Sequence, residues 1–577
     1  MRVLLVHPED NFDALWGSEH WDLIVDLGKA PRSFYEAWSR SLGCRVFSIF
    51  DLAIEIDDLK VWRNLLRAGM GCVVDRFGID WWDVLSLTLQ PELQDMRLVS
   101  RLAEQLRQCS ELVVSRPSIM AHALHLQLRV PLTVRQSSLR SRFATRVMHY
   151  GEALHNLSFR QVRQVVYDKY DVHYAWRRNF STMPARSAEP LVLLPSAYSN
   201  VTKTALQYTR SLPDQRFLVV LARESGAVSG LPANVTMAPL AAFAKRSPEI
   251  SEVQQLEDRW TRLEQSLQEE PDFRLSLQVG LLTKARNWLS WGLTVRDAWE
   301  GVFGKQSIVG CLSADDSNPN TRIPLLLARH RGIPTVSCHH GALDSSAAFK
   351  APCSSIRLAQ GEMERDYLER VCGVNAGTIR VGAPISSSEN RLLWKDDSPW
   401  IVFFTEPYEA GFWRAEAVYR DVLPRLCALA RKAGKSIVLK VHPFETARQR
   451  RRLVKKILNE DDQKLAVVME APLSSEILSK TWCAVTVEST VALQCAVAGI
   501  PVFLCGWMRH AYSGYALQYV RFGLGYMMES PGDLLRIPQI MNDAMRRADV
   551  ADRVVQAISS SALAEILLRT PARSLVS

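Results

Sequence analysis

The stretch IPTVSCHHGALD, residues 333–344, decides how the rest of the chain is interpreted. Its first half is a short apolar run with β-branched residues, which is typical of a buried strand. The run ends in His339, His340 and Gly341, and a glycine lets the backbone turn tightly where a strand leaves its sheet. Two imidazoles at the rim of a sheet suit proton transfer or phosphate binding. A histidine that only makes a structural hydrogen bond at a strand end is the alternative.

Similar apolar runs recur along the chain, separated by longer amphipathic stretches. This alternation predicts an α/β fold with parallel sheets. The first series of predicted strands is 2–8, 44–50, 111–117, 131–136, 191–197, 216–223, 307–314 and 334–341. The second series is 400–407, 436–445, 464–470, 483–490 and 501–507.

A polar, Ser- and Asp-rich bridge within residues 378–399 separates the two series and predicts a domain boundary. We expect a Rossmann-like N-terminal domain over 1–385, with helical insertions near 137–190 and 251–303, and a Rossmann-like C-terminal domain over 386–577. Ligands of doubly wound sheets bind at the carboxyl ends of the strands. The two domains are therefore expected to face each other across a cleft lined by strand ends.

The composition narrows the class of protein. A net charge of +9 fits an anionic partner, and it fits an ordinary solvated surface equally well. The eleven cysteines form no C-x-x-C pair, which predicts a reduced, cytosolic protein without disulfide bonds or a zinc site. The opening MRVLLVHP has four apolar residues before His7, which predicts a first strand and not a signal peptide. No apolar run reaches about 18 residues, so no membrane span is predicted, and peripheral attachment stays open.

Two carboxylates follow the strand in CLSADDSNPNTR, residues 311–322. Asp316 has two interpretations, a general base at a strand end or an ordinary residue preceding a helix. For Asp315 the capping interpretation is favoured.

The motif LKVHPFE, residues 439–445, combines a cation with an imidazole. Lys440 and His442 alternate along the strand, so their side chains are expected on one face. Pro443 cannot continue the ladder and releases the strand into a loop. Two such donors at a strand end suit a monophosphate or a diphosphate.

The stretch VTVESTVALQCAVAGIPVFL, residues 485–504, predicts a strand, a helix that begins at once, and a further strand after Gly499. Glu488, Ser489 and Thr490 lie at the junction. Hydroxyls and free N–H groups at a helix start can bind an anion. A plain helix cap is the alternative.

Other motifs are absent or weaker. The sequence has no P-loop, G-x-G-x-x-G, G-x-S-x-G or H-E-x-x-H motif and no metal-ligand cluster. The basic run RQRRRLVKK, residues 448–456, predicts the solvated face of a helix, with contact to anionic lipid headgroups as the alternative.

The strand ends taken together resemble a known group of enzymes. The run SIVGCLSADDSNPNTRIPLLLARHRGIPTVSCHHGAL resembles the closing part of the first domain in GT-B glycosyltransferases of bacterial surface polysaccharide assembly. LKVHPFE and VESTVALQCAVAGIPVFL resemble the His-Pro and Ser-Ser/Thr donor motifs of bacterial polysialyltransferases and capsule Kdo transferases. Teichoic-acid glycerophosphotransferases carry a related set. The resemblance covers about residues 305–505.

The resemblance implies a role for each matching residue. His442, Ser489 and Thr490, with Lys440, Pro443 and Glu488 nearby, would bind the phosphate of a nucleotide-sugar donor. His340 falls on the His-Gly position that acts as the base in the glycerophosphotransferases. Asp316 and the pair Glu9 and Asp10 are further candidates for an acidic residue on the acceptor side, where His339 is also expected. Gln494 stands where many relatives have a Glu that binds the ribose.

We therefore expect a metal-independent, inverting glycosyltransferase without a cofactor, acting on a glycan or lipid-linked acceptor in the cytoplasm, with peripheral membrane attachment open and no nucleic-acid partner. Three alternatives remain. They are a phosphotransferase that uses a CDP-alcohol, a UDP-sugar 2-epimerase, and a non-catalytic GT-B scaffold.

Overall fold

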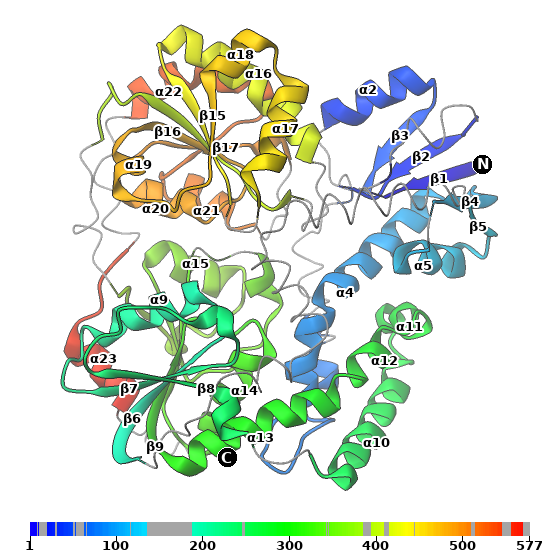
Figure 1. Cartoon of the computed structure of the whole chain (residues 1–577). Helices are drawn as coiled ribbons and strands as arrows, with labels where there is room; N and C mark the ends of the chain where they lie inside the picture. The colour runs from blue at the N-terminus through cyan, green and yellow to red at the C-terminus, as the bar shows by residue number, and fades with distance from the viewer. Residues whose placement is uncertain are drawn as a thin grey trace. The chain divides into compact units, whose positions relative to one another are not determined.

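The computed structural model describes the chain except residues 8–9, 11–19, 29–31, 50–51, 53–62, 65, 116, 136–186, 245–247, 342, 344, 385–393, 409–414, 443–444, 509–513, 545–554 and 569–577. The described strands form three sheets, and every strand pair within them is parallel. The predicted α/β class with parallel sheets is confirmed (Figure 1).

The N-terminal sheet has the strand order β3-β2-β1-β4-β5. Its strands are β1 (Arg2–Val6), β2 (Leu23–Asp26), β3 (Arg45–Ser48), β4 (Glu111–Val114) and β5 (Leu132–Val134). The helices of this region are α2 (Arg32–Leu42), α4 (Trp81–Gln105) and α5 (Ile119–Leu128).

The middle sheet has the order β12-β11-β10-β9-β6-β7-β8. Its strands are β6 (Ser187–Ser196), β7 (Arg216–Leu221), β8 (Val235–Pro239), β9 (Gln306–Ser313), β10 (Thr335–Ser337), β11 (Ile356–Ala359) and β12 (Ile379–Val381). The helices are α9 (Ser199–Thr209), α10 (Ile250–Leu267), α11 (Pro271–Gln278), α12 (Leu281–Arg286), α13 (Leu289–Lys305), α14 (Pro319–His330) and α15 (Glu362–Arg370).

The C-terminal sheet has the order β15-β14-β13-β16-β17-β18. Its strands are β13 (Trp400–Phe404), β14 (Ser436–Lys440), β15 (Ala466–Met469), β16 (Thr481–Thr486), β17 (Val502–Leu504) and β18 (Tyr526–Met527). The helices are α16 (Ala415–Ala433), α17 (Ala447–Ile457), α18 (Glu460–Leu465), α19 (Ser475–Ser479), α20 (Val491–Val497), α21 (Ala516–Arg521) and α22 (Ile537–Ala544). In Figure 1, α16 to α18 lie above this sheet and α19 to α21 below it.

All three sheets share one topology. Renumbered from its own first strand, each sheet begins 3-2-1-4-5, which is the order of a Rossmann-like doubly wound sheet. The expected single N-terminal domain over 1–385 therefore contains two such sheets. There is an additional sheet because the described strands within residues 2–134 pair with one another and not with the strands within 187–381.

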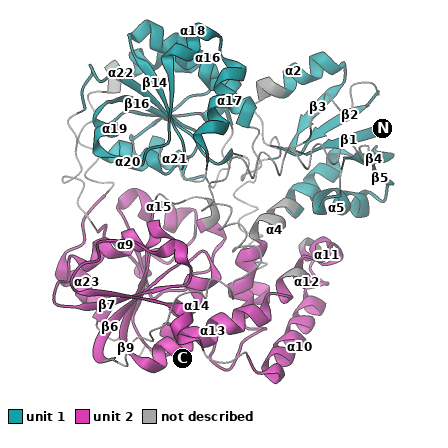
Figure 2. Ribbon diagram, in the orientation of Figure 1, with its two compact units in different colours: residues 1–55, 95–163, 390–551 teal, residues 56–94, 164–389, 552–577 magenta. Residues whose placement is uncertain are grey.

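The chain divides into two compact units (Figure 2). One unit holds the N-terminal and C-terminal sheets, and the other holds the middle sheet together with residues 552–577. In the second unit, helix α23 (Ser560–Leu568) packs Leu563 and Leu567 into the core of the middle sheet. Gly310 makes this possible, because a Cβ atom there would lie 2.3 Å from the carbonyl oxygen of Leu567.

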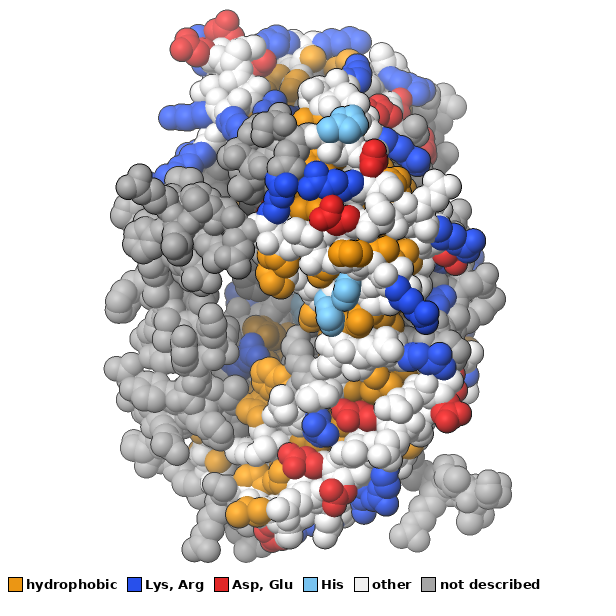
Figure 3. Space-filling model, turned by 90° about the vertical axis from the view of Figure 1, so that its right-hand side faces the viewer, with side chains coloured by type: hydrophobic (Ala, Val, Ile, Leu, Met, Phe, Trp, Pro, Cys, Tyr) orange, Lys and Arg blue, Asp and Glu red, His pale blue; other side chains and the backbone are white. Residues whose placement is uncertain are grey.

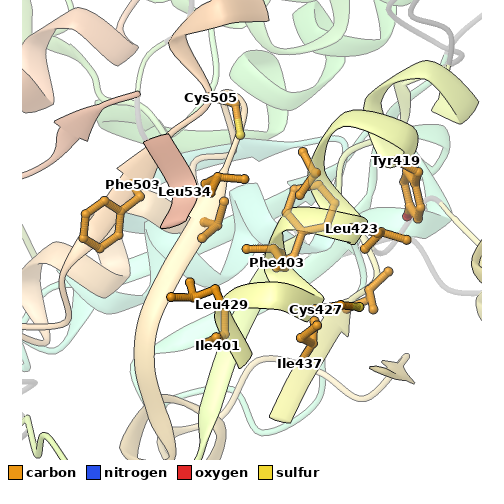
Figure 4. Packing of buried hydrophobic residues seen from close by; sticks show 14 of the residues in the cluster. Ile401, Phe403, Tyr419, Leu423, Cys427, Leu429, Ile437, Phe503, Cys505 and Leu534 are labelled. Atoms are coloured by element: carbon orange, nitrogen blue, oxygen red, sulfur yellow. The ribbon is translucent and has the colours of Figure 1, made fainter. Parts of the chain in front are cut away.

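The core of the C-terminal sheet follows from the spacing of apolar residues in α16. Its buried apolar residues recur at intervals of three and four, which puts them on one face of a helix. This face packs on alternate side chains of the strands, as Figure 4 shows. The residues labelled there include Tyr419, Leu423, Cys427, Ile401, Phe403 and Ile437. Each fully buried aliphatic or aromatic side chain stabilises the fold by about 1.5–3 kcal/mol.

Most predicted strands are present, with ends shifted by a few residues. Sequence reasoning missed β2, β8, β11, β12 and β18, which have two to five residues each. The predicted insertion at 251–303 is helical and corresponds to α10 to α13. The other one, near 137–190, lies almost entirely outside the described residues.

Candidate functional site

The carboxyl edge of the C-terminal sheet brings together most of the predicted phosphate-binding residues. β13 lies between β14 and β16, which is the place where the strand order reverses and where doubly wound sheets bind ligands. Phe404 is level with Lys440 of β14, and Phe403 with Val485 of β16. The segments 440–442 and 486–490 therefore leave the sheet on either side of 405–406.

Lys440 and His442 form the cationic part of this edge. Lys440 is buried, and its Nζ donates a hydrogen bond to the carbonyl oxygen of Val441 at 2.8 Å. Burial lowers the pKa of Lys440, while the charges of Glu470 and Glu445 oppose that shift. The pKa of His442 is lowered by burial and then by the charge of Lys440. Lys440 therefore acts electrostatically on His442, which lies two residues beyond the end of β14.

Glu445 fixes the backbone at His442. Its Oε2 accepts hydrogen bonds from Thr405 Oγ1 at 2.5 Å and from the His442 N–H at 3.2 Å. Its Oε1 pairs with the buried guanidinium of Arg450. Burial raises the pKa of Glu445, opposed by Arg450 and Thr405. This arrangement holds the turn that carries His442, so the imidazole is presented from a supported backbone.

Glu406 joins the segment 486–490 to this edge of the sheet. Its Oε1 accepts hydrogen bonds from Thr486 Oγ1 at 3.0 Å and from the Glu488 N–H at 2.6 Å. The Ser489 N–H donates a hydrogen bond to Thr486 Oγ1 at 3.3 Å. Ser489 is buried, while Glu488 and Thr490 are exposed. The predicted residues Ser489 and Thr490 thus lie at this edge, one buried and one facing solvent.

Two predictions about this edge have different outcomes. Gly499 ends α20 with a φ of +79°, as expected of a glycine after a helix. Pro443 lies outside the described residues. The edge therefore offers a buried ammonium group, an imidazole that is half-buried and two hydroxyls, a set of donors suited to phosphate oxygens.

The carboxyl edge of the middle sheet holds the two histidines. The rings of His339 and His340 stack with centroids 4.6 Å apart. The carbonyl oxygen of Gly341 accepts a hydrogen bond from Gln360 Nε2 at 2.8 Å and lies 3.2 Å from His339 Nδ1. His340 Nδ1 is buried and has no hydrogen-bond partner in the described part of the chain. If His340 accepts a substrate proton, Nε2 is therefore the nitrogen that takes it.

The surroundings of Asp316 argue against a role as the general base. Its side chain is 1% exposed and forms ion pairs of 2.7 Å with both Lys350 and Arg357. Although burial alone would raise its pKa, these cations and Arg322 hold the pKa of Asp316 far below its usual range. A carboxylate with so little proton affinity does not take a proton from a hydroxyl. The local sequence showed no sign of these ion pairs, because the cations come from later parts of the chain.

The rest of this buried cluster is also structural. The guanidinium of Arg322 is fully buried and binds both carboxylate oxygens of Asp83 at 2.7–2.9 Å. It also donates to the carbonyl oxygens of Asp316 and Ala351. Asp315 accepts from the Ser317 N–H at 2.8 Å, which is a turn contact in the loop before α14, whose N-cap residue is Asn318.

Glu364 is a buried carboxylic acid beside this cluster. Its Oε2 accepts a hydrogen bond from the Gln360 N–H at 3.0 Å, and its Oε1 has no partner among the described residues. Burial raises the pKa of Glu364 to about 7, opposed by that hydrogen bond and by the charge of Arg357. Burial is the main cause of the raised pKa values of Tyr208 and Cys338, and the charge of Glu364 raises both of them further.

The N-terminal sheet places Asp10 at its own point of reversal. The Asp10 carboxylate accepts from Ser115 Oγ, which follows β4, at 2.8 and 2.9 Å. It also accepts from the His7 N–H at 2.8 Å. Its oxygens thus hold the ends of β1 and β4 together. The other predicted residue here, Glu9, lies outside the described part of the chain.

A surface cavity of about 230 Å³ lies near the start of α10 and contains none of the predicted site residues. Its inner carboxylates are already paired, because the buried Arg296 binds Glu252 at 2.6 Å and Asp75 at 2.8 Å. We assign it no ligand.

Within the described ranges, no three His, Cys, Asp or Glu side chains cluster in a way that could hold a metal ion. No described helix has both the length and the apolar composition needed to cross a bilayer.

Sequence reasoning missed the residues that support both edges. Thr405 and Glu406 directly follow the strand run WIVFF, and the rule that ligands bind at strand ends would have found them. Glu445 lies within the quoted LKVHPFE motif. Lys350, Arg357 and Glu364 carried no signal, because nothing in their local sequence links them to Asp316.

Comparison with solved structures finds remote similarities. A UDP-GlcNAc 2-epimerase from Methanocaldococcus jannaschii shows 12% identity over 66% of this chain and 99% of its own, with a TM-score of 0.40. A putative UDP-N-acetylglucosamine 2-epimerase from Listeria monocytogenes shows 9% identity over 66% and 97%, with a TM-score of 0.42. The wall teichoic acid polymerase TagF shows 11% over 73% and 96%, with a TM-score of 0.37. No family model and no curated protein matches the chain. Similarity at this level does not define the activity of this chain.

Proposed function

We propose that this protein is a GT-B glycosyltransferase that moves a sugar from a nucleotide-sugar donor to a hydroxyl of a glycan or lipid-linked glycan in bacterial surface polysaccharide synthesis. The observation that carries the proposal is the meeting of Lys440, His442 and the segment 486–490 at the point of reversal of the C-terminal sheet. Donor groups from three strand ends converge there, as a diphosphate requires.

In this proposal the C-terminal sheet stabilises the leaving nucleotide diphosphate. Lys440 supplies a positive charge from a buried position, where an electrostatic interaction is stronger than in water. The imidazole of His442 and the hydroxyls of Ser489 and Thr490 add hydrogen bonds. These groups supply the neutralising charge that a divalent cation provides in other transferases, so we propose a metal-independent reaction.

The proton of the acceptor hydroxyl goes to His340. With Asp316 ion-paired and buried, His340 is the remaining candidate base on the middle sheet, and Nε2 is its available nitrogen. An imidazole has a proton affinity suited to general-base catalysis near neutral pH. Attack by the acceptor oxygen on the anomeric carbon, opposite the departing phosphate, gives inversion. We place the enzyme in the cytoplasm, on or near a membrane that carries the acceptor.

The first experiment is a thermal-shift screen of the full chain against CMP, CDP, UDP and GDP. A ligand present at 100 times its Kd stabilises the folded state by about 2.7 kcal/mol, which shifts the melting temperature measurably. We expect one nucleotide to stabilise the wild type, and His442→Ala to lose that effect. His20→Ala, which removes an exposed histidine of the same unit, is the matched control.

The outcomes separate the alternatives. Slow hydrolysis of the donor releases a free sugar if the protein is a glycosyltransferase, and an alcohol phosphate if it is a phosphotransferase of the teichoic-acid type. A UDP-sugar 2-epimerase converts its substrate without an acceptor. Absence of stabilisation by all four nucleotides would contradict the proposed donor site and leave a non-catalytic scaffold.

A further inference from the structure

The positive charge of the chain is concentrated in one short region. Residues 415–465 hold thirteen Lys and Arg against six Asp and Glu, a net charge of +7, while the whole chain has +9. Fewer than a tenth of the residues thus account for most of the excess positive charge of the chain. A charge asymmetry of this kind points to an anionic partner more strongly than a mildly basic average does.

Helix α17 presents this charge on one face. Its exposed cations are Arg448, Arg451, Arg452, Lys455 and Lys456. Their positions follow the i, i+3, i+4, i+7, i+8 spacing, which aligns side chains along one side of a helix. The helix itself contains no Asp or Glu, and Lys456 at its end pairs with Glu416 of α16 at 2.6 Å. On the face drawn in Figure 3, Lys and Arg side chains are interspersed with Asp and Glu side chains.

The opposite face of α17 is already used by the fold. Val454 belongs to the core of the C-terminal sheet, and Leu453 and Ile457 pack against it. Arg450, the one buried basic residue of the helix, pairs with Glu445. The cationic stripe is therefore held in place by a packed helix, and binding to it needs no refolding.

The form of the stripe favours a planar partner. Three turns of helix are about 16 Å long, and their outer side is convex. A convex row of charges touches a flat anionic surface along its whole length, whereas an extended soluble polyanion is better held in a groove. Basic helices of this kind bind anionic lipid headgroups.

We propose that the exposed face of α17 docks this protein on an anionic membrane surface through lipid phosphate headgroups. The contact is electrostatic and reversible, since the apolar side of the helix stays in the core. It does not depend on the proposed transferase activity, because the stripe lies outside the residues assigned to the donor.

The test measures binding of the full chain to vesicles. The probes are vesicles of phosphatidylcholine alone and vesicles with about 30% phosphatidylglycerol. The variant is Arg451→Gln with Arg452→Gln and Lys455→Gln. The matched control, Lys203→Gln with Arg210→Gln and Arg262→Gln, removes the same charge from exposed positions of the other unit. Equal melting temperatures of the proteins would establish that they are all folded.

We expect the wild type and the control to bind only the anionic vesicles, and to be released as salt rises from about 0.05 to about 0.5 M. The α17 variant should bind about 100-fold more weakly, at about five-fold for each cation removed. Equal binding of variant and control would overturn the proposal. So would binding to neutral vesicles, or retention on dextran sulfate without vesicle binding, which would identify a soluble polyanion as the partner. A failed nucleotide screen has no bearing on this result.

Discussion

The carboxyl edges of the middle and C-terminal sheets occupy the same place in two sheets of one topology, yet their charges are used differently. At the middle sheet, Asp316 is neutralised by two cations at 2.7 Å in the interior. At the C-terminal sheet, the buried Lys440 forms no ion pair in the described part of the chain, and its charge lowers the pKa of His442. At one edge the buried carboxylate is neutralised by ion pairs, while at the other the buried Lys440 has no carboxylate within ion-pair distance in the described part of the chain.

This difference shows how a structural charge can be distinguished from a functional one. Buried ions that satisfy each other hold segments together, and removal of one partner destabilises the fold. A buried cation without a carboxylate partner costs desolvation energy, which a bound anion can offset. In the proposed function, the first edge would contribute chemistry through its rim, where His340 lies, and the second through Lys440 and His442.

The largest effect is expected at that rim. His340→Asn should lower kcat by about 10²–10⁴-fold, because the acceptor proton loses its base. The protein should keep its melting temperature, since His340 is only half-buried. Transfer to an acceptor, followed with the donor found in the nucleotide screen, measures the effect.

His339→Asn is the control for this prediction, because it removes the stacked neighbour and leaves His340 in place. We expect a change in kcat of less than about ten-fold. Equal losses in both variants would mean that the pair acts by packing alone and would refute the assignment of the base.

The next effect is on stability. Asp316→Asn leaves Lys350 and Arg357 buried without their carboxylate, and removal of one member of a buried ion pair costs about 3–5 kcal/mol. Urea unfolding measures the change. A variant as stable as the wild type but inactive would reverse our conclusion and return Asp316 to the role of catalytic base.

The sequence predicted the strand ends better than it predicted the roles of the residues on them. Apolar runs such as WIVFF and TWCAVT identified the central strands, because a strand buried on both faces is apolar throughout. Short strands such as β12 and β18 were harder to see, because two or three residues form no pattern. The separate N-terminal sheet was missed because strand pairing depends on contacts that are distant in sequence.

The site was predictable where neighbouring residues share one chemistry. Lys440 and His442 are two residues apart and lie at one strand end, so their local pattern sufficed. The ion pairing of Asp316 was not predictable, because its partners Lys350 and Arg357 are 34 and 41 residues away in the sequence. A motif gives the residue type at a position, and only the fold gives the charges around it.

A smaller effect is expected from the acid next to the neutralised edge. The pKa of Glu364 is about 7 in the fold, against an ordinary value of 4.5. The folded state therefore holds this proton more tightly, and the free energy of unfolding falls as the pH rises from about 4.5 to about 7. Glu364→Gln removes this pH dependence and should be more stable than the wild type at pH 8, by up to about 3 kcal/mol.

Urea unfolding of both proteins at several pH values measures this difference. Glu362→Gln, a half-exposed position on the same helix, is the control and should follow the wild type. A wild type and a Glu364→Gln variant with the same pH profile would show that Glu364 keeps its charge in the fold, neutralised by Arg357.

The smallest effect concerns the pH dependence of donor binding at the edge that holds Lys440 and His442. Burial and Lys440 hold the pKa of His442 below its ordinary value of 6.5, so the imidazole is neutral at pH 7 and gains a proton only in more acidic solution. A protonated imidazole binds a diphosphate more strongly, and we expect the Kd of the nucleotide-sugar to fall by up to about ten-fold between pH 7 and about pH 5.5. The diphosphate of a nucleotide-sugar has no group that titrates in this range.

Calorimetric titrations of the wild type and His442→Asn measure the effect, and the variant should show a constant Kd. Lys440→Met should move the wild-type transition to higher pH, because it removes one of the two causes that lower the pKa of His442. If the Kd varied equally with pH in His442→Asn, the proton would belong to another group, and the contrast between the two edges would lose its functional meaning.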